Sequence, residues 1–408
     1  MKSATAISYE LDNIETASKE LVTQIKEKLT FGENTIAILH GQPSMDIEKL
    51  SAAVSRELGC HVIGGTTAAG ASLTNEGYHE LAVILHVLTA DDCIFAAAIS
   101  GSLEVKPEKE LTDVYQKAYH ILEEQDATAE PQMVICLASI VQSIASDIIL
   151  DKISKLCGNV PVFGFNAGDD FDFSKQQVYL DGETGGDRLA LLLISGNIKP
   201  IFQTSNLAGK KALEKRLVTK AHDNIIYEIN GRPAYDYIKE FPFIDDQTTT
   251  LFNYQFFVEM QNDSYNDGIP VSRALNTYNK ETGEVTCFAN VPENSYIGLL
   301  YCDGNDVAST TEAGIIEFLE KLNLCDRPFD RGDVNNYEYS TVLVATCSLR
   351  NMFLADMKET EGDLIKKLIP PNLTVSGLYA FGEIAPTSIR SGRAVNQFHN
   401  ATFTICAF

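Results

Sequence analysis

Two arginines in the second half of the chain could recognise a carboxylate. Arg273 lies in the β-rich run VSRALNTY, and Arg350 ends the segment TCSLR. A guanidinium can hold a carboxylate through two parallel N–H bonds, which is the contact that a sensor of amino acids requires. The same group is equally suited to an internal ion pair with one of the 56 Asp and Glu residues. The sequence leaves both interpretations open.

Further polar residues stand at the ends of apolar runs near the carboxyl terminus. They are Cys347, Glu383, His399 and Asn400. Ligands of α/β proteins usually bind at strand ends, so these residues are candidate ligand contacts. Glu383 could hold an amino group or accept a nearby backbone N–H. His399 could equally be a buried histidine with a structural hydrogen-bond partner.

Two glycine-rich turns, VIGGTTAAG at 62–70 and VFGFNAGDD at 162–170, offer another candidate site. Their backbone N–H groups, with Thr66, Thr67, Asn166 and Asp169, could line a polar ligand cleft. Alternatively, the glycines only permit tight turns. Neither turn has the spacing of a P-loop or of a dinucleotide-binding site, so we do not predict nucleotide binding.

Catalytic and metal-binding patterns find little support. The chain has no G-x-S-x-G elbow, no C-x-x-C and no H-E-x-x-H. His79 and His86 have an odd separation, which puts them on opposite faces of a strand. A cysteine-dependent enzyme would need Cys347 and His399 to meet in space, and this stays an alternative hypothesis. No catalytic or metal-ligating residue is predicted.

The elements that must position these residues repeat within the first half. One copy runs from the apolar segment Thr35–His40 to Gly70, and a second runs from Met133–Ala138 to Asp170. Each predicts a strand, an amphipathic helix, a strand and a Gly-rich turn. Ser44 or Asp46 can cap the first helix and Ser143 or Ser146 the second, while Gly59 and Gly158 can end them.

The second half reads differently. It predicts a strand, a turn at Asn230–Gly231 and a short helix, then β-rich runs, a helix over Thr311–Leu322, a polar loop over Asp326–Tyr339 and a helix over Lys358–Leu368. We therefore predict an α/β protein of mixed α+β type, with layered sheets covered by helices. It would comprise a duplicated amino-terminal domain over residues 30–220 and a carboxy-terminal α+β domain over 225–408.

Composition limits the partners. The formal net charge of −24 would repel nucleic acids and anionic membranes. The amino terminus lacks the apolar segment of a secretory signal, and the apolar runs are too short for a membrane span. We expect a cytoplasmic protein whose nine cysteines are mostly reduced core thiols.

Taken in order, the motifs resemble those of the FIST family, the F-box and intracellular signal transduction proteins. The resemblance covers about residues 30–408 and rests on the two Gly-rich turns, GRPA at Gly231–Ala234, the pair Cys347 and Arg350, GEIAP at Gly382–Pro386 and FHNAT at Phe398–Thr402. In FHNAT, Ala401 replaces the glutamine common in the family.

The resemblance implies a bacterial sensory protein that recognises a small polar ligand such as an amino acid. It would signal to a separate protein, such as a histidine kinase or a cyclic-dinucleotide enzyme. Some similar proteins are haem-binding nitric oxide sensors that act on a histidine kinase, so a haem held by one histidine is the alternative cofactor hypothesis.

Overall fold

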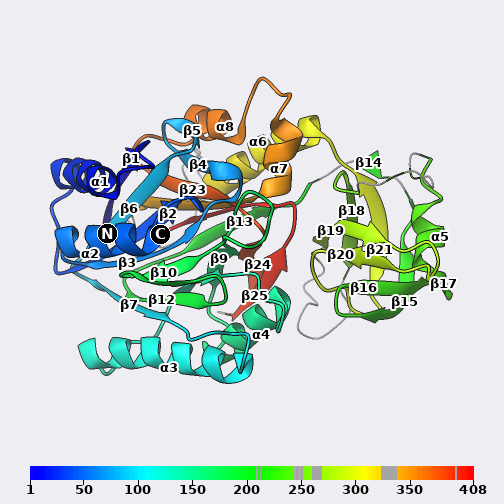
Figure 1. Ribbon diagram of the computed structural model, residues 1–408, viewed down its shortest axis with the longest axis horizontal. Coiled ribbons are helices and arrows are strands. Elements are labelled where there is room, and N and C mark those ends of the chain that lie inside the picture. Colours follow the sequence, from blue (N-terminus) through cyan, green and yellow to red (C-terminus); the bar gives the residue numbers. More distant parts are fainter. Residues whose placement is uncertain are drawn as a thin grey trace, which may run out of the picture.

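The computed structural model describes residues 1–207, 210–211, 213–242, 244, 248, 251–259, 269–322, 338–390 and 393–408. Within these ranges, three sheets form a large body, and a closed β-barrel stands beside it (Figure 1). The predicted mixed α/β class is confirmed. None of the described helices combines the length and the apolar composition that a membrane span needs.

The body contains three units with the same order of elements: strand, helix, strand, helical connection, strand, hairpin, strand. The first unit comprises β1 (Lys2–Ser8), α1 (Ile14–Lys28), β2 (Asn34–Gly41), α2 (Ile47–Leu58), β3 (His61–Thr66), the 3-10 turn η1 (Ala68–Gly70), β4 (Ala71–Thr74), β5 (Gly77–Glu80) and β6 (Val83–Ala90). The second comprises β7 (Cys93–Ile99), α3 (Pro107–Gln125), β8 (Met133–Ala138), α4 (Ser146–Leu156), β9 (Val162–Asn166), β10 (Val178–Leu180), β11 (Glu183–Gly185) and β12 (Leu189–Gly196).

The third unit is interrupted by the barrel. It comprises β13 (Ile201–Ser205), then α6 (Gly304–Lys321), β22 (Thr341–Cys347), α7 (Ser348–Leu354), α8 (Glu361–Leu368), β23 (Thr374–Ala380), β24 (Glu383–Arg390), β25 (Arg393–His399) and β26 (Phe403–Ala407). The barrel comprises β14 (Lys210–Lys211), β15 (Arg216–His222), β16 (Ile225–Ile229), β17 (Arg232–Pro233), α5 (Ala234–Ile238), β18 (Tyr254–Glu259), β19 (Val271–Tyr278), β20 (Val285–Cys287) and β21 (Tyr296–Tyr301). A pairing of β18 with β21 closes the barrel.

The hairpin of each unit pairs with the sheet of another unit and not with its own. The sheet orders are β1-β6-β2-β3-β10-β11, β7-β12-β8-β9-β24-β25 and β13-β26-β22-β23-β4-β5. In every sheet, a parallel pair lies next to the borrowed hairpin: β2 with β3, β8 with β9, and β22 with β23. The exchange is cyclic, because the first unit borrows from the second, the second from the third and the third from the first.

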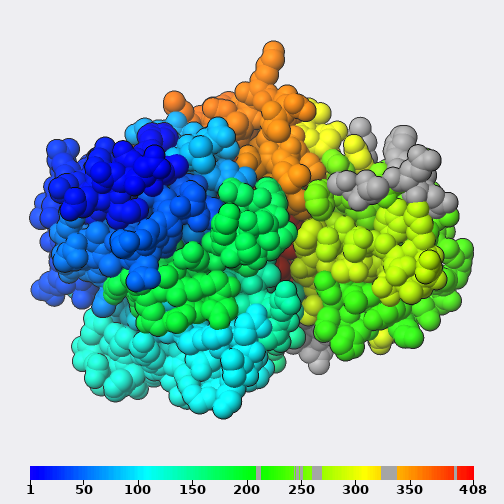
Figure 2. Space-filling model, viewed as in Figure 1, coloured from blue at the N-terminus to red at the C-terminus, as the bar shows by residue number. Residues whose placement is uncertain are grey.

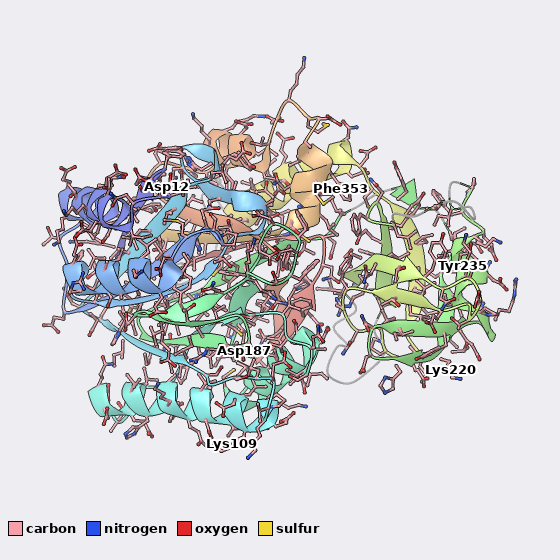
Figure 3. The ribbon with its side chains drawn as sticks, in the orientation of Figure 1. Asp12, Lys109, Asp187, Lys220, Tyr235 and Phe353 are labelled. Atoms are coloured by element: carbon pink, nitrogen blue, oxygen red, sulfur yellow. The ribbon has the colours of Figure 1, made fainter. Side chains whose placement is uncertain are left out.

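The three sheets enclose one common apolar core. Ile38 of the first sheet, Leu192 of the second and Ala345 of the third belong to the same buried cluster. The opposite face of each sheet packs against its own helices: α1 and α2, α3 and α4, or α6 and α8. Charged side chains such as Lys109 on α3 and Lys220 on the barrel point outward (Figure 3). A separate cluster fills the barrel.

The local signals in the sequence act largely as predicted. The Asp46 carboxylate accepts the Lys49 N–H at the start of α2, and Gly59 ends that helix in the left-handed conformation, with φ 73°. Asn230 and Gly231 also have positive φ, 51° and 72°, in the predicted turn. The prediction of Ser143 or Ser146 as the cap of α4 is wrong, because Ala145 holds that position without a side-chain hydrogen bond.

The predicted division into 30–220 and 225–408 stays a prediction, but the sheets group the elements differently. Residue 225 falls inside the barrel, β1 belongs to the first sheet, and α1 packs against that sheet. His79 and His86 lie on separate strands, β5 and β6, so the one-strand spacing argument does not apply. Most of the predicted loop Asp326–Tyr339 lies outside the described residues. The eight described cysteines are free thiols, as predicted.

Two buried histidines make stability depend on pH. Burial lowers the pKa of His40 and of His86 to about 3, on the core side of β2 and β6. An unfolded histidine has a pKa of about 6.5, so below that pH the unfolded chain binds protons that the folded chain cannot. Stability should therefore fall as the pH drops from about 6.5 towards 3, by about 1.4 kcal/mol per pH unit for each histidine.

The variant His40→Leu isolates one of these contributions. Between pH 6.5 and pH 5, the native protein should lose about 2 kcal/mol more stability than His40→Leu does, because the variant lacks one linked proton. Urea unfolding at several pH values measures this difference in slope, whatever the absolute stability of the variant. Parallel pH curves for the two proteins would contradict a buried neutral His40.

Candidate functional site

A cavity of about 630 Å³ lies between the body and the barrel. The seam between these two parts is visible in Figure 2, where the yellow-green barrel meets the rest of the molecule. The lining residues come from the second and third units and from the barrel: Ile140, Ser146, Asn166, Phe171, Phe173, Phe252, Ala274, Asn276, Phe288, Cys347, Ser348, Leu349, Met352, Phe381, Phe398 and Asn400. We call this space the junction cavity.

The fold explains where the junction cavity forms. The parallel pairs β8–β9 and β22–β23 end at Ala138 and Asn166, and at Cys347 and Ala380. The backbone N–H of Asn166 donates to the carbonyl of Gly382, which brings these strand ends together. Carboxyl ends of parallel strands commonly hold ligands in α/β proteins, and the barrel adds the opposite wall.

Phenylalanines dominate the wall. Phe171 and Phe173 lie 5.6 Å and 4.8 Å from Phe381 between ring centres, on the body side. Phe252 and Phe288 contact each other on the barrel side, with ring centres 6.1 Å apart. These rings reach solvent: the exposed fractions of Phe171, Phe173 and Phe288 are 38%, 47% and 37%. Exposed apolar groups gathered on one cavity indicate a binding site.

A carboxylate holds the loop that carries Phe171 and Phe173. Both residues have positive φ, 66° and 59°, a conformation that is costly for a bulky side chain. The buried Asp169 accepts the N–H of Phe173 at 3.1 Å and that of Lys175 at 3.0 Å. Asp169 therefore positions the aromatic loop and does not itself line the cavity.

Two asparagines supply polar atoms to the wall. Asn166 donates from its amide nitrogen to Ser146 Oγ at 2.6 Å, and Asn400 donates to the carbonyl of His399 at 3.1 Å. Both residues are almost fully buried, and the Oδ1 atom of each has no hydrogen-bond partner among the described residues. A buried acceptor without a partner is unfavourable, so a donor from a ligand or a water would stabilise it.

The threonines of the first Gly-rich turn lie elsewhere. Thr66 Oγ1 donates to the carbonyl of Gly168 at 2.7 Å and accepts the N–H of Gln177 at 2.9 Å. Thr67 is buried beside it, and neither residue lines the junction cavity. These contacts join the first unit to the second, which favours the interpretation of this turn as a structural connection.

Cys347 and Glu383 form a buried pair at the edge of the cavity. Burial, reinforced by Glu383, raises the pKa of the Cys347 thiol well above its usual value. Burial also raises the pKa of Glu383 to about 8, although Thr402 donates two hydrogen bonds to its Oε2. The His399 Nε2 lies 3.1 Å from the carbonyl of Ala385. A thiol kept protonated is a poor nucleophile, so this arrangement does not favour cysteine catalysis.

Arg350 belongs to a buried network beneath the cavity. Its Nε donates to Glu361 Oε1 at 2.8 Å, and its Nη2 donates to Thr311 Oγ1 at 2.7 Å. Thr346 donates to the other oxygen of Glu361 at 2.8 Å. The side chains of Arg350 and Glu361 are both fully buried. Arg350 therefore acts as an internal ion-pair partner in this structure.

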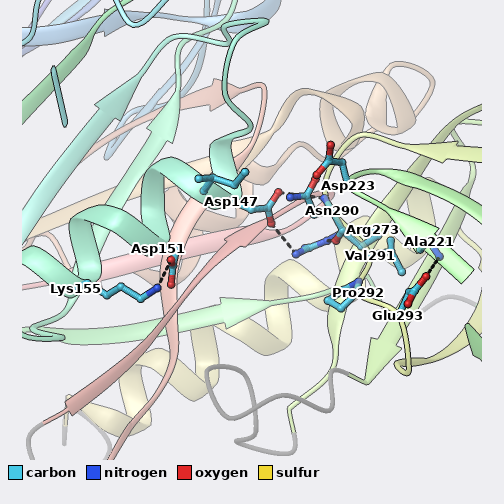
Figure 4. A pocket seen from close by; sticks show the side chains of 11 residues that line it. Asp147, Asp151, Lys155, Ala221, Asp223, Arg273, Asn290, Val291, Pro292 and Glu293 are labelled. Carbon is cyan, nitrogen blue, oxygen red and sulfur yellow. Dashed lines mark hydrogen bonds and ion pairs between the residues drawn. The ribbon is translucent and has the colours of Figure 1, made fainter. Parts of the chain in front are cut away.

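Arg273 joins the barrel to the body. Its Nη2 donates to Asp147 Oδ1 at 3.0 Å on α4, and its Nη1 donates to the carbonyl of Phe398 at 2.8 Å on β25. Figure 4 shows this pair at a second cavity, of about 370 Å³. Asn290 completes the contact, because its N–H donates to Asp147 and its carbonyl accepts from Arg273. We call these three residues the interdomain clamp.

Comparison with protein-family models assigns the chain. Residues 35–232 match the FIST N domain, and residues 234–386 match the FIST C domain. The chain belongs to the FIST family. FIST domains are sensory domains of signal transduction, which fits a protein that is not an enzyme. No curated protein matches the sequence.

In this FIST protein, the residues selected from the sequence fall into three groups. Asn166, Cys347 and Asn400 line the junction cavity. His399 lies between the lining residues Phe398 and Asn400, and Glu383 lies two residues after Phe381, while Arg273 and Arg350 are held in buried ion pairs. Thr66, Thr67 and Asp169 shape the turns behind the cavity. Whether any of them binds a ligand stays a prediction.

A haem would need a histidine facing a cavity large enough to hold it. The described residues that line the junction cavity include no histidine, and His40 and His86 are buried in the core of the body. His61, which does line a cavity, lies 2.5 Å from the Asp181 carboxylate. Among the described residues, no cluster of His, Cys, Asp and Glu could hold a metal ion. The residues of the junction cavity therefore do not fit an axial haem ligand.

Sequence reasoning missed the aromatic wall. The phenylalanines at 171, 252, 288 and 381 lie far apart along the chain, and each is unremarkable in its own segment. One signal was available, since the run DDFDF at 169–173, which begins at the end of the second Gly-rich turn, places two phenylalanines among acidic residues. Large apolar side chains within a polar loop often mark a binding surface.

Proposed function

We propose that this FIST protein is a ligand-binding sensor and that the junction cavity is its input site. The observation that supports this most is the set of solvent-reaching phenylalanines from both the body and the barrel on one cavity. A ligand with an apolar body would bury these rings, and its hydrogen-bond donors would satisfy Asn166 and Asn400.

An amino acid fits this proposal less well than the sequence suggested. The described lining residues include no Lys, Arg or His, because Arg273 and Arg350 are held in ion pairs. A ligand carboxylate would therefore lose its hydration without gaining a cationic partner. The apolar part of the ligand supplies most of the affinity in this proposal.

Signal output follows from the position of the site. A ligand held between Phe252 on the barrel and Phe381 on the body favours the arrangement in which both walls contact it, so it shifts the population towards that arrangement. The changed surface would be read by a separate signalling protein, such as a histidine kinase or a cyclic-dinucleotide enzyme, in the cytoplasm. The partner and the compartment are parts of the proposal.

The absence of tryptophan allows a site-specific test. The chain contains no Trp, so Phe288→Trp would place a single reporter in the junction cavity. We expect compounds from a library of small aromatic and aliphatic molecules to change the emission of this reporter in a saturable manner. Tyr296→Trp, at a barrel residue of similar exposure outside the cavity lining, is the matched control. Equal responses of both reporters, or none, would count against the proposed site.

A further inference from the structure

The chemistry of the junction cavity also indicates which charge a ligand should carry. We propose that the junction cavity takes an organic ammonium ion with an apolar body, an inference that rests on the proposed function. Three observations support it: the aromatic wall, the unpaired amide oxygens, and the lack of charged residues among the described lining residues of a chain with a strongly negative net charge.

The aromatic wall favours a cation. The faces of aromatic rings carry a negative quadrupole, which attracts ammonium groups within about 6 Å of the ring centre. Phe171, Phe173 and Phe381 present such rings from the body, and Phe252 and Phe288 present them from the barrel. Several rings around one space form the type of cage that binds alkylammonium groups.

The polar atoms of the wall favour a donor-rich ligand. An ammonium group has three N–H donors and no acceptor. Asn166 Oδ1 and Asn400 Oδ1 are acceptors without described partners, and Asn400 is fixed in this orientation because its amide nitrogen donates to the carbonyl of His399. An ammonium group that reaches either oxygen would supply the donor that this oxygen lacks.

The surrounding charge disfavours an anion. None of the described lining residues is charged, so a carboxylate or phosphate would find no cationic partner there. The exposed Asp170 flanks Phe171 in the aromatic loop, whereas Asp172 is paired with Lys175 at 3.4 Å, and the formal net charge of the chain is −24. The field of such a protein attracts cations and repels anions over about a Debye length.

Three matched probes separate the possibilities. 2-Phenylethylammonium, 2-phenylethanol and 3-phenylpropionate carry similar apolar bodies with a positive, a neutral and a negative end. Calorimetric titration of the full chain at low salt should show the ammonium binding about tenfold more tightly than the alcohol, and the carboxylate binding more weakly than both. The preference for the ammonium should shrink as the salt concentration rises.

Phe173→Leu tests the aromatic contribution, because leucine keeps an apolar side chain but removes the ring. We expect the preference for the ammonium over the alcohol to fall about threefold, while Tyr296→Leu leaves it unchanged. If the alcohol or the carboxylate binds as tightly as the ammonium, the ammonium proposal is wrong and the sensor proposal stands. If none of the three probes binds and the Phe288→Trp reporter is silent towards the library, both proposals are wrong.

Discussion

Glu361→Gln is expected to lower the free energy of unfolding by about 3–5 kcal/mol. The substitution preserves the shape of the side chain but removes the charge that compensates Arg350. Both side chains are fully buried, so the guanidinium would remain away from water without a counterion. The loss of the charged acceptor also weakens the hydrogen bond from Thr346.

Urea unfolding of the full chain measures this loss. Glu312→Gln is the matched control, since Glu312 pairs with Lys367 at an exposed position, and its replacement should cost less than about 1 kcal/mol. The double variant Arg350→Met, Glu361→Leu should recover much of the lost stability, because it removes both charges together. A loss below about 1 kcal/mol for Glu361→Gln would show that the pair is not buried as described.

Arg273→Met should lower stability by about 3 kcal/mol and should loosen the barrel selectively. Methionine fills part of the space but leaves Asp147 buried without its cation. It also removes the hydrogen bond to the carbonyl of Phe398, so two contacts between barrel and body are lost together. Because burial already raises the pKa of Asp147, the variant should favour the protonated carboxyl still more strongly.

Hydrogen exchange followed by mass spectrometry locates this effect. Amides in Ser146–Leu156 and in Val271–Tyr278 should exchange faster in the variant, whereas those in Ile14–Lys28, on the far side of the body, should not change. Arg232→Met provides the control, since Arg232 pairs with Asp236 at the barrel surface, and its loss should cost less than about 1 kcal/mol. Uniform acceleration across the chain would argue that the clamp has no specific role in attaching the barrel.

Local features of the fold could be read from the sequence, whereas long-range features could not. The helix at Ile47–Leu58 was predictable because its cap, its apolar spacing and its terminal glycine all lie within one segment. The third unit was hidden because the barrel separates β13 from α6. The hairpin exchange was equally hidden, since the pattern of a strand such as β24 does not specify which neighbour it pairs with.

The candidate site shows the same division. Asn166, Cys347 and Asn400 could be selected because polar residues at strand ends are a local signal. The ion pair of Arg350 with Glu361 in particular could not be predicted, because Glu361 is one of many acidic residues. Only the folded structure shows which of them contacts Arg350. The opposing aromatic rings depend on the position of the barrel, which no local pattern encodes.

Because the hairpin of each unit is part of the sheet of another unit, the three units of the body cannot separate without disrupting a sheet. A fragment limited to residues 35–232, the part that matches the FIST N domain, would lack β1, and it would lack β24, which covers the free side of β9. Without β24, the strand β9 would expose unpaired N–H and C=O groups, a state that promotes association with other chains. The segment 234–386 would likewise lack β26, which pairs with both β13 and β22. We therefore expect neither matched segment to form its sheets completely without the rest of the described chain.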